Sequence, residues 1–545
     1  MPLGLACRIC TSLSASLPRG RLRVSASFAP RVRTMFRSSP SDEHLFSYTG
    51  GRWLWDEERQ RRLRYRRFDV DALKRLAIEA AGAKTCNGIE KIAEGGSNRV
   101  FRLLLDTGPV IVRVPMVKEA RTHMVMASEV ATMEYARCIL KLPVPKVFAW
   151  NGDDNNPAGI SYMIMEEASG QQLSKSWHRL DLEAQTTIVE QIVGIANAMT
   201  SVRFASSGNL FLRSDSPCPH HEIRAASELP PSLQDELASR FVLGPSVASE
   251  FWEDGRAALD LDRGPWSHPS GFLRAIAECG MTSIAHSMGG CHVTDDPRTV
   301  LSLYHKYLQI VDSLCSRDPM LNESVVWHWD LRTQNIFVKG DKITSLIDWQ
   351  DVWAGPLFLQ VEHPPIVDYN GALLLKLPDN YESMVDKVAK QKVRDRVQRS
   401  ILLYTFEAKI KRSKQVFRSL LDLPHGKTIR QTVHFAKNMQ HRGSLALRQC
   451  LMRVQQNWSS IAGDGPCPIS FSEAELEQHY ADAEGWNTEA EFWEGLDGFV
   501  MSDGWTNNED YEEALAFFEG LGEEGRVFLD YKKPNVSDWS CAPRK

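Results

Sequence analysis

The sequence predicts an α+β protein in which a short β-rich region precedes a longer, mostly helical one. Two β-type runs flank a Gly-Gly turn between Ile92 and Leu105, and a third run covers Pro109–Pro115. From about Gln171 to Leu321 the apolar residues follow a helical pattern, interrupted by loops rich in Ser, Pro and Gly. Because 545 residues exceed one typical domain, two large lobes with additions are expected.

Changes in composition along the chain predict where these parts begin and end. The expected parts are a leader (1–40), an N-terminal basic and aromatic extension (41–90), a β-rich lobe (91–168), a helical lobe (169–425), a C-terminal helical extension (426–530) that is acidic after residue 470, and a tail (531–545).

The stretch from Val325 to Asp348 carries groups suited to phosphoryl transfer. It contains His-x-Asp ending at Asp330, then Asn335, then a short apolar run that leads to Asp348. Phosphoryl transfer needs a carboxylate beside the acceptor and oxygen ligands for Mg²⁺. Two short strands with a tight turn at 339–342 are predicted between Asn335 and Asp348. Such a hairpin brings both residues to one end, where they can reach one ion together with substrate phosphates.

A nucleotide lid is predicted upstream, on the strands of the β-rich region. Gly95-Gly96-Ser97-Asn98 is expected to form a turn whose backbone N–H groups approach phosphate closely. The next strand has a single cation, Arg113, among apolar residues, and a buried cation requires a partner. Glu129, in a helical pattern downstream, is the first candidate for that partner, and Glu134 is the second.

Together these motifs resemble the aminoglycoside phosphotransferase-like branch of the protein-kinase superfamily. The segments Met163-Ile-Met-Glu-Glu and Ile347-Asp348-Trp349 extend the resemblance, which covers most of the chain from about Phe46 onward. Within this branch the chain is similar to the fungal mitochondrial group called altered inheritance of mitochondria protein 9. Tyr48-Thr-Gly-Gly-Arg-Trp-Leu-Trp and Tyr65-Arg-Arg-Phe strengthen that match.

The resemblance implies a two-lobed protein-kinase-like fold with a small β-rich N-lobe, a larger mostly helical C-lobe and a C-terminal helical extension. It implies ATP and Mg²⁺ as cofactors. By position, Asp330 matches the catalytic Asp, and Asn335 and Asp348 match the metal ligands. Glu166 and Glu167 fall near the interlobe hinge that contacts adenine.

Three positions depart from the pattern of the wider superfamily. Arg113 stands where most kinases have Lys, and a planar guanidinium fork is not equivalent to a compact ammonium group. Trp329 fills a position commonly held by a small residue, where a large ring either restricts the acceptor or packs in the core. Trp349-Gln350-Asp351 lacks the Phe-Gly of protein kinases, which favours a relative of small-molecule kinases.

The leader predicts a mitochondrial destination. Its acid-poor, Ser-rich sequence has no Asp or Glu before Asp42, and its arginines are Arg8, Arg19, Arg21, Arg23, Arg31, Arg33 and Arg37. This composition is typical of an organellar transit peptide, with cleavage expected between about Arg21 and Asp42. An unstructured basic tail is the alternative.

Charge and hydropathy limit the partners. A net charge of −5 gives no indication of nucleic-acid binding, and no apolar run reaches the roughly 18 residues of a membrane span. The segment from Phe471 to Asp530 is strongly acidic, and the spacing of Phe492, Leu496 and Phe499 predicts helices packed on the larger lobe. Its charges form a solvated face, pair with the basic segment 387–418, or recruit a protein partner.

The leading hypothesis is an ATP- and Mg²⁺-dependent phosphotransferase that acts on an unknown small molecule in mitochondria. The alternative is a catalytically weak or inactive kinase-like protein with a role in mitochondrial maintenance or inheritance. A hydrolase with Ser287 as nucleophile is a third reading, because Ala285-His-Ser-Met-Gly-Gly resembles a nucleophile elbow. The Gly-broken segment before Ser287 disfavours it, since that elbow follows a buried strand.

Overall fold

The computed structural model describes residues 42–217, 219–287, 296–496 and 498–522. The predicted leader (1–40) and tail (531–545) lie outside these ranges. None of the helices in the described ranges combines the length and the apolar character needed to cross a membrane.

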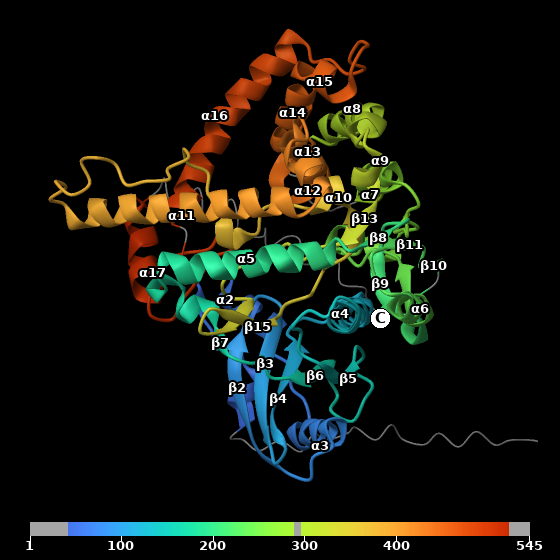
Figure 1. The fold of residues 1–545 in the computed structure, drawn as a ribbon, viewed down its shortest axis with the longest axis vertical. Helices are drawn as coiled ribbons and strands as arrows, with labels where there is room; N and C mark the ends of the chain where they lie inside the picture. Colours follow the sequence, from blue (N-terminus) through green and yellow to red (C-terminus); the bar gives the residue numbers. More distant parts are fainter. Residues whose placement is uncertain (1–41, 218, 288–295, 497, 523–545) are drawn as a thin grey trace, which may run out of the picture. The chain divides into compact units, whose positions relative to one another are not determined.

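A five-stranded antiparallel sheet forms the N-lobe (Figure 1). Its strands lie in the order β2-β3-β4-β6-β5, with bounds Cys86–Glu94 (β2), Asn98–Leu105 (β3), Gly108–Pro115 (β4), Val147–Asn151 (β5) and Tyr162–Glu166 (β6). The first strand thus begins ahead of the boundary predicted at residue 91. The Gly-Gly turn lies between β2 and β3 as predicted, and the Gly95 amide donates to the Asn98 carbonyl oxygen at 2.9 Å.

The alternation of β4 directs its side chains to two environments. Val110, Val112 and Val114 are buried in a cluster with helix α3 (Val70–Ala81), and Phe101 of β3 packs in the same cluster. Successive residues of a strand point to opposite faces, so Arg113 faces away from this cluster. On that other face lies helix α4 (Thr122–Glu134), which continues as a π-helix over Tyr135–Ile139.

Helix α4 is buried on nearly all sides because both lobes contact it. It packs against β5 of the N-lobe and against β9 (Asn209–Leu212) of the C-lobe. The Asn209 side chain donates to Ser128 Oγ at 2.9 Å, and Ala127 shares a cluster with Phe211. A helix that is apolar all round is typical of such a doubly covered position.

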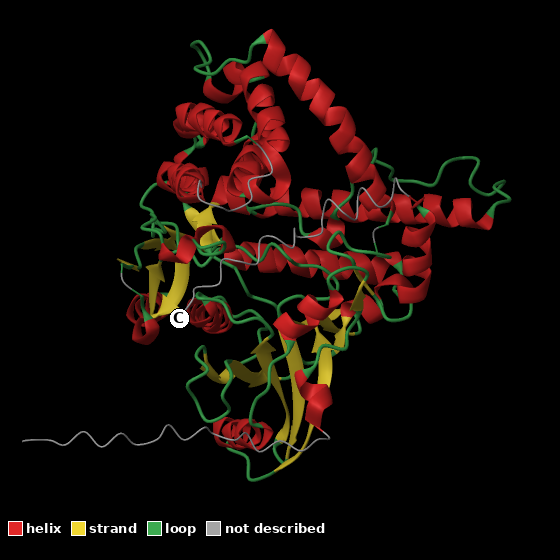
Figure 2. Cartoon of the chain, turned by 180° about the vertical axis from the view of Figure 1, so that it is seen from behind, coloured by secondary structure: helices red, strands yellow, loops and turns green. Residues whose placement is uncertain are grey.

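The C-lobe is mostly helical, as predicted (Figure 2). Its helices are α5 (Leu182–Met199), α6 (Pro231–Arg240), α7 (Pro269–Ser287), α8 (Pro297–Leu314), α9 (Pro319–Asn322), α10 (Leu357–Gln360), α11 (Lys387–Ser413), α12 (Gln415–Leu421), α13 (Gly426–Lys437), α14 (Met439–Gln456) and α15 (Trp458–Ala462). Ser287 ends helix α7 and does not follow a strand, so the hydrolase elbow is absent.

Three small sheets lie among these helices. One has the order β15-β14-β7, with Lys342–Leu346 (β15), Ile336–Lys339 (β14) and Gln171–Gln172 (β7). A second has the order β11-β8-β13-β16, with Ala225–Ser227 (β11), Val202–Phe204 (β8), Ser324–Val326 (β13) and Ala354–Pro356 (β16). In the third, β12 (Phe241–Gly244) pairs with both β9 and β10 (His221–Glu222).

The C-lobe core continues beyond residue 425, where the C-terminal extension was predicted to begin. Ile429, Val433, Leu447, Leu451 and Ile469 belong to the same hydrophobic cluster as the buried residues of α5 and α8. Helices α13 and α14 therefore share their packing with the C-lobe, because their apolar faces are covered by it.

The acidic segment begins as the long helix α16 (Glu473–Gly495), which contacts α14, and Arg448 forms an ion pair with Asp482 at 3.1 Å. Farther on, a second cluster contains Leu496, Val500 and, from helix α17 (Tyr511–Gly520), Phe518. Leu54 and Trp55 of the N-terminal extension pack against it. Helix α16 thus contacts the larger lobe, but the predicted face of Phe492, Leu496 and Phe499 packs on the N-terminal extension together with the last helix. The helix ends at Gly495, so Leu496 and Phe499 lie beyond it.

The N-terminal extension consists of α1 (Glu43–Phe46), β1 (Arg52–Trp53) and α2 (Glu57–Arg64) ahead of α3. Strand β1 pairs antiparallel with β17 (Trp505–Thr506) from the far end of the chain. The extension is anchored on β3 by Arg99, whose fully buried guanidinium donates to the carbonyl oxygens of Leu45 (3.2 Å) and Phe46 (3.0 Å).

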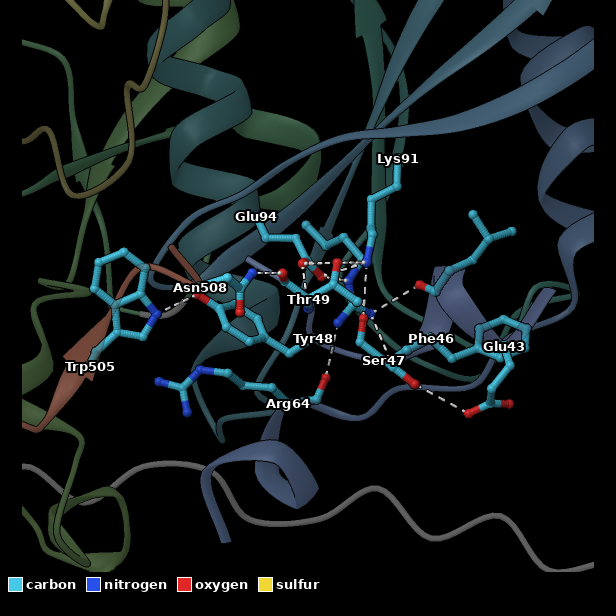
Figure 3. A network of polar contacts seen from close by, with 12 residues as sticks. Glu43, Phe46, Ser47, Tyr48, Thr49, Arg64, Lys91, Glu94, Trp505 and Asn508 are labelled. Atoms are coloured by element: carbon cyan, nitrogen blue, oxygen red, sulfur yellow. Dashed lines mark hydrogen bonds and ion pairs between the residues drawn. The ribbon is translucent and has the colours of Figure 1, made fainter. Parts of the chain in front are cut away.

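Glu94 is the carboxylate that neutralises this anchor, as the close view in Figure 3 shows. Its Oε1 accepts from Arg99 Nε at 2.7 Å and lies 3.2 Å from Lys91 Nζ, and its Oε2 accepts from the Thr49 amide at 2.7 Å. Burial opposes ionisation, but the donors of Thr49 and Arg99 hold the pKa of Glu94 below its ordinary value.

We predict that Glu94→Gln lowers the free energy of unfolding by about 1.5–3 kcal/mol at pH 7, because charged hydrogen bonds become neutral ones. A carboxyl with a depressed folded-state pKa stabilises above its unfolded-state pKa and loses that contribution as pH falls through the folded value. The difference between wild type and Glu94→Gln, measured by urea unfolding, should therefore shrink below about pH 4. Parallel stability profiles from pH 7 to pH 3 would contradict this role.

Candidate active site

The predicted hairpin places Asn335 and Asp348 at one end. β14 and β15 pair antiparallel with Ile336 opposite Leu346, and the turn Gly340–Asp341 closes the far end. Just beyond the pairing, the Ile347 amide donates to the Asn335 carbonyl oxygen at 3.0 Å. The residues that flank the hairpin therefore lie side by side, as the spacing in the sequence predicts.

Asp330 is held in this arrangement by the side chain of Asn335. Asn335 Nδ2 donates to Asp330 Oδ2 at 2.8 Å and to the Asp330 carbonyl oxygen at 3.0 Å. Arg332 Nη2 lies 3.1 Å from the same Oδ2. Within the described part of the chain, Asp330 Oδ1 and Asn335 Oδ1 carry no hydrogen bond, so each keeps an oxygen available to a ligand.

His328 links the loop of Asp330 to the loop of Asp348. Its Nε2 donates to the Ile347 carbonyl oxygen at 3.0 Å, and its ring meets that of Trp349 edge to face at 4.7 Å between centroids. The side chain is 1 % exposed, and burial lowers the pKa of His328. A neutral imidazole thus holds the backbone immediately before Asp348, whose φ of 66° lies in the left-handed region.

Arg113 pairs with Glu129, the first of the two carboxylates that the sequence proposes. Each terminal nitrogen of the guanidinium donates to one carboxylate oxygen, Nη1 to Oε1 at 2.6 Å and Nη2 to Oε2. The Arg113 and Glu129 side chains are 13 % and 1 % exposed. Burial opposes the charge on Arg113, but the adjacent Glu129 carboxylate raises its pKa, and Asp348 and Asp351 act in the same direction. Glu134 instead pairs with Arg137 and Arg240.

One cavity of about 160 Å³ brings the predicted lid together with this ion pair. The predicted nucleotide-binding residues that line it are Gly96, Ser97, Asn98, Arg113 and Glu129. Gln350, two residues after Asp348, also lines the cavity, and its Oε1 accepts from Asn98 Nδ2 at 3.0 Å. The cavity therefore lies between the glycine turn of the N-lobe and the Asp348 loop of the C-lobe.

Glu166 and Glu167 lie where the chain leaves the N-lobe sheet. Glu166 is the last residue of β6, and the chain enters the C-lobe sheet at β7 shortly afterwards. Glu167 Oε1 accepts from Arg102 Nε at 2.9 Å, so this side chain is engaged with β3. At Gly170, φ is 102° and an added Cβ would lie 2.5 Å from the Val338 carbonyl oxygen, so this connection requires glycine.

Sequence reasoning missed Arg121, which joins the start of α4 to the C-lobe. Its guanidinium donates to the Val247 carbonyl oxygen at 2.6 Å and to Glu253 at 2.9 Å, and lies 3.6 Å from Asp351 Oδ1. Burial raises the pKa of Asp351, and Arg121 opposes that shift. No local signal marked its role in joining the lobes, because Val247, Glu253 and Asp351 lie more than a hundred residues away in the sequence.

Trp329 does not pack in the core. Its side chain is 54 % exposed, although it directly precedes Asp330 and follows two buried residues. The ring therefore forms part of the surface, one position before Asp330 in the sequence.

The residues fit a magnesium ion in number and chemistry. Mg²⁺ takes oxygen ligands and is usually held by one or two carboxylates with substrate phosphates completing the shell. Asp348 is exposed, and Asn335 turns its amide nitrogen toward Asp330 so that Oδ1 points elsewhere. Across residues 42–522, where described, no cluster of three or more His, Cys, Asp or Glu could hold a metal alone.

Comparison with known proteins agrees with this geometry. Residues 88–272 match the profile of the phosphotransferase enzyme family, APH. A subtelomeric hrmA-associated cluster protein of Aspergillus fumigatus is 28 % identical over 451 residues, covering 74 % of this chain and 85 % of the relative. Altered inheritance of mitochondria protein 9 of Yarrowia lipolytica is 25 % identical over 509 residues, covering 87 % of this chain and 86 % of the relative. The family model and these relatives support the aminoglycoside phosphotransferase-like family that the motifs indicate.

Among solved structures, the chain is similar to aminoglycoside phosphotransferase APH(4)-Ia. The match has 13 % identity and a TM-score of 0.35, and it covers 72 % of this chain and 99 % of that one. The relatives of the protein 9 group are named as mitochondrial in Yarrowia lipolytica and Candida albicans. These names support the mitochondrial location that the leader predicts.

We predict that Arg113→Met destabilises the protein by about 3–5 kcal/mol, because it leaves the buried Glu129 charge unpaired. Adding Glu129→Leu should recover most of that loss, as measured by urea unfolding. The matched control is Glu134→Leu in the same Arg113→Met background, which should recover nothing. Equal recovery by both leucine variants would show that the pairing is wrong.

Proposed function

We propose that the protein is an ATP- and Mg²⁺-dependent phosphotransferase that acts on a small hydroxyl- or amine-bearing molecule in mitochondria. The observation that carries this proposal is the placement of Asp330, Asn335 and Asp348 around one end of a hairpin. Phosphoryl transfer depends mainly on positioning and charge stabilisation, and these residues supply groups for both.

The nucleotide side of the site lies in the N-lobe. The backbone N–H groups of Gly96, Ser97 and Asn98 are assigned to the phosphates, because these residues line the same cavity as Arg113. Gly95, the fourth predicted residue, closes the turn instead, since its amide already donates to the Asn98 carbonyl oxygen. Arg113 steadies the phosphates by its charge while Glu129 fixes its orientation. Residues 166–167 are assigned to the adenine, through the exposed end of β6.

Asn335 Oδ1 and Asp348 are the groups that would hold the metal. When bound, Mg²⁺ neutralises charge on the nucleotide phosphates during transfer. His328 keeps Asp348 in place through the Ile347 carbonyl, and Ile347 in turn bonds Asn335. The two ligands are thus supported by one continuous set of backbone contacts.

Asp330 is assigned to the acceptor. Both of its partners, Asn335 Nδ2 and Arg332 Nη2, contact Oδ2 and leave Oδ1 to accept a proton from the acceptor hydroxyl or amine. The exposed Trp329 ring beside this carboxylate limits which acceptors can approach. This feature also favours the second candidate, a kinase-like protein that binds nucleotide with little turnover.

The transit peptide and the acidic segment complete the proposal. The arginine-rich leader is assigned to mitochondrial import, in agreement with the names of the relatives. The acidic residues after 470 are assigned to a protein partner, because many of them on α16 and α17 face solvent.

Thermal denaturation with AMP-PNP and Mg²⁺ tests nucleotide binding. We expect wild type to be stabilised by about 2.7 kcal/mol at a ligand concentration 100 times Kd, since a ligand that binds only the folded state raises its stability. Asp348→Asn should lose the part of this shift that depends on Mg²⁺. Asp341→Asn, at the opposite end of the same hairpin, is the control and should behave as wild type. A wild type with no nucleotide-dependent shift would refute the proposal.

ATP turnover by the full chain separates the two candidate functions. We expect slow Mg²⁺-dependent formation of ADP that Asp330→Ala reduces by roughly 10²–10⁴-fold, the usual contribution of a positioned base. Asp330→Ala should still bind AMP-PNP. Nucleotide binding without any turnover sensitive to Asp330 would favour the kinase-like binding protein over the enzyme.

A further inference from the structure

The loop Gly95–Ser97 is held at both ends by residues outside the N-lobe sheet. At one end Glu94, which directly precedes the loop, accepts from Thr49 N at 2.7 Å and from Thr49 Oγ1 at 2.9 Å. At the other end the Ser97 carbonyl oxygen accepts from the Met116 amide at 2.8 Å. The position of the loop thus depends on what holds Thr49 and Met116.

A segment near the C-terminal end of the described chain bonds Thr49 and packs against the cluster that contains Met116. Asn508 Nδ2 donates to the Thr49 carbonyl oxygen at 2.9 Å, across 459 positions of sequence. Trp505 packs against the cluster of Tyr48, Trp53 and Met116, and its Nε1 donates to the Tyr48 hydroxyl at 2.9 Å. Figure 3 shows Trp505 and Asn508 approaching Tyr48 and Thr49 from the same side.

This segment is fitted to the N-terminal extension by backbone pairing as well. β17 pairs with β1, the Leu54 amide donates to the Gly504 carbonyl oxygen at 2.9 Å, and Trp53 Nε1 donates to Asp503 Oδ2 at 3.2 Å. An added Cβ at Gly51 would lie 2.5 Å from Trp505 Nε1, so the close approach of the indole needs a glycine.

We propose that residues 503–508 are a positioning element of the nucleotide site, acting on the phosphate-binding loop through Thr49 and Met116. The inference rests on the proposed function, in which Gly96, Ser97 and Asn98 bind phosphate. Backbone N–H groups bind a ligand more tightly when the loop already holds them in the bound orientation. Restricting the loop in the free protein lowers the conformational entropy lost on binding. Trp505 and Asn508 restrict the loop without contacting it, because they hold residues that bond to it.

A merely structural role for residues 503–508 makes a different prediction. In that case their loss lowers the free energy of unfolding but leaves nucleotide affinity unchanged at a temperature where the protein is folded. Affinity and loop exchange, measured well below the unfolding transition, therefore distinguish positioning from stability alone.

The experiment compares two matched pairs of variants in the full chain. Asn508→Ala removes the bond to Thr49, whereas Asn507→Ala changes a neighbouring exposed amide whose Nδ2 donates only within its own turn, to Asp510 at 3.2 Å. Thr49→Val removes the hydroxyl that donates to Glu94 and accepts from Lys91 Nζ at 2.7 Å, whereas Thr49→Ser keeps it. The Kd for AMP-PNP with Mg²⁺ is measured by calorimetry, and amide hydrogen exchange is followed at residues 95–98.

We expect Asn508→Ala and Thr49→Val each to raise the Kd by roughly two- to tenfold, the effect of losing one or two hydrogen bonds that hold the loop. Exchange at residues 95–98 should become faster in these two variants, and Asn507→Ala and Thr49→Ser should match wild type. Unchanged affinity and unchanged exchange in Asn508→Ala and Thr49→Val would overturn the inference. A wild type that does not bind AMP-PNP overturns the proposed function, and the exchange data then still decide whether the C-terminal segment positions the loop.

Discussion

The buried ion pair between Arg113 and Glu129 is the interaction on which the arrangement of the site depends. Both charges are withdrawn from water, so each requires the other in one geometry, and the bidentate contact fixes β4 against α4. Helix α4 is in turn tied to the C-lobe through Arg121 and through Ser128, which accepts from Asn209. The pair therefore relates the strand that carries Arg113 to the lobe that carries Asp330.

In the C-lobe, the site residues are held in position by hydrogen bonds rather than by a buried ion pair. The neutral His328 ring bonds the backbone before Asp348 and supports its left-handed conformation, which β-branched and bulky residues avoid and Asp tolerates. Asn335 bonds Asp330 with its amide nitrogen, and the hairpin places Asp348 beside it. Positions of the carboxylates thus follow from short-range contacts, whereas their relation to Arg113 follows from the packing of α4.

Local patterns explain which features could be predicted. The hairpin between Asn335 and Asp348, the Gly95–Asn98 turn and the pairing of Arg113 with Glu129 all arise within short stretches of sequence. Strand alternation and turn formation depend on neighbouring residues, so they can be predicted from one sequence. The contact of Arg121 with Val247 and that of Asn98 with Gln350 could not be predicted. Each joins segments separated by more than a hundred residues.

The sequence by itself determined the chemistry: the order of Asp330, Asn335 and Asp348, the glycine turn and the cation on the third strand. These depend on residue type and spacing, which folding does not change. Only the tertiary structure decided that Trp329 faces solvent beside Asp330, that α13 and α14 complete the C-lobe core, and that Trp505 and Asn508 reach Tyr48 and Thr49. Many apolar and polar surfaces compete for such long-range contacts, and the pattern of residues along the chain does not indicate which of them form.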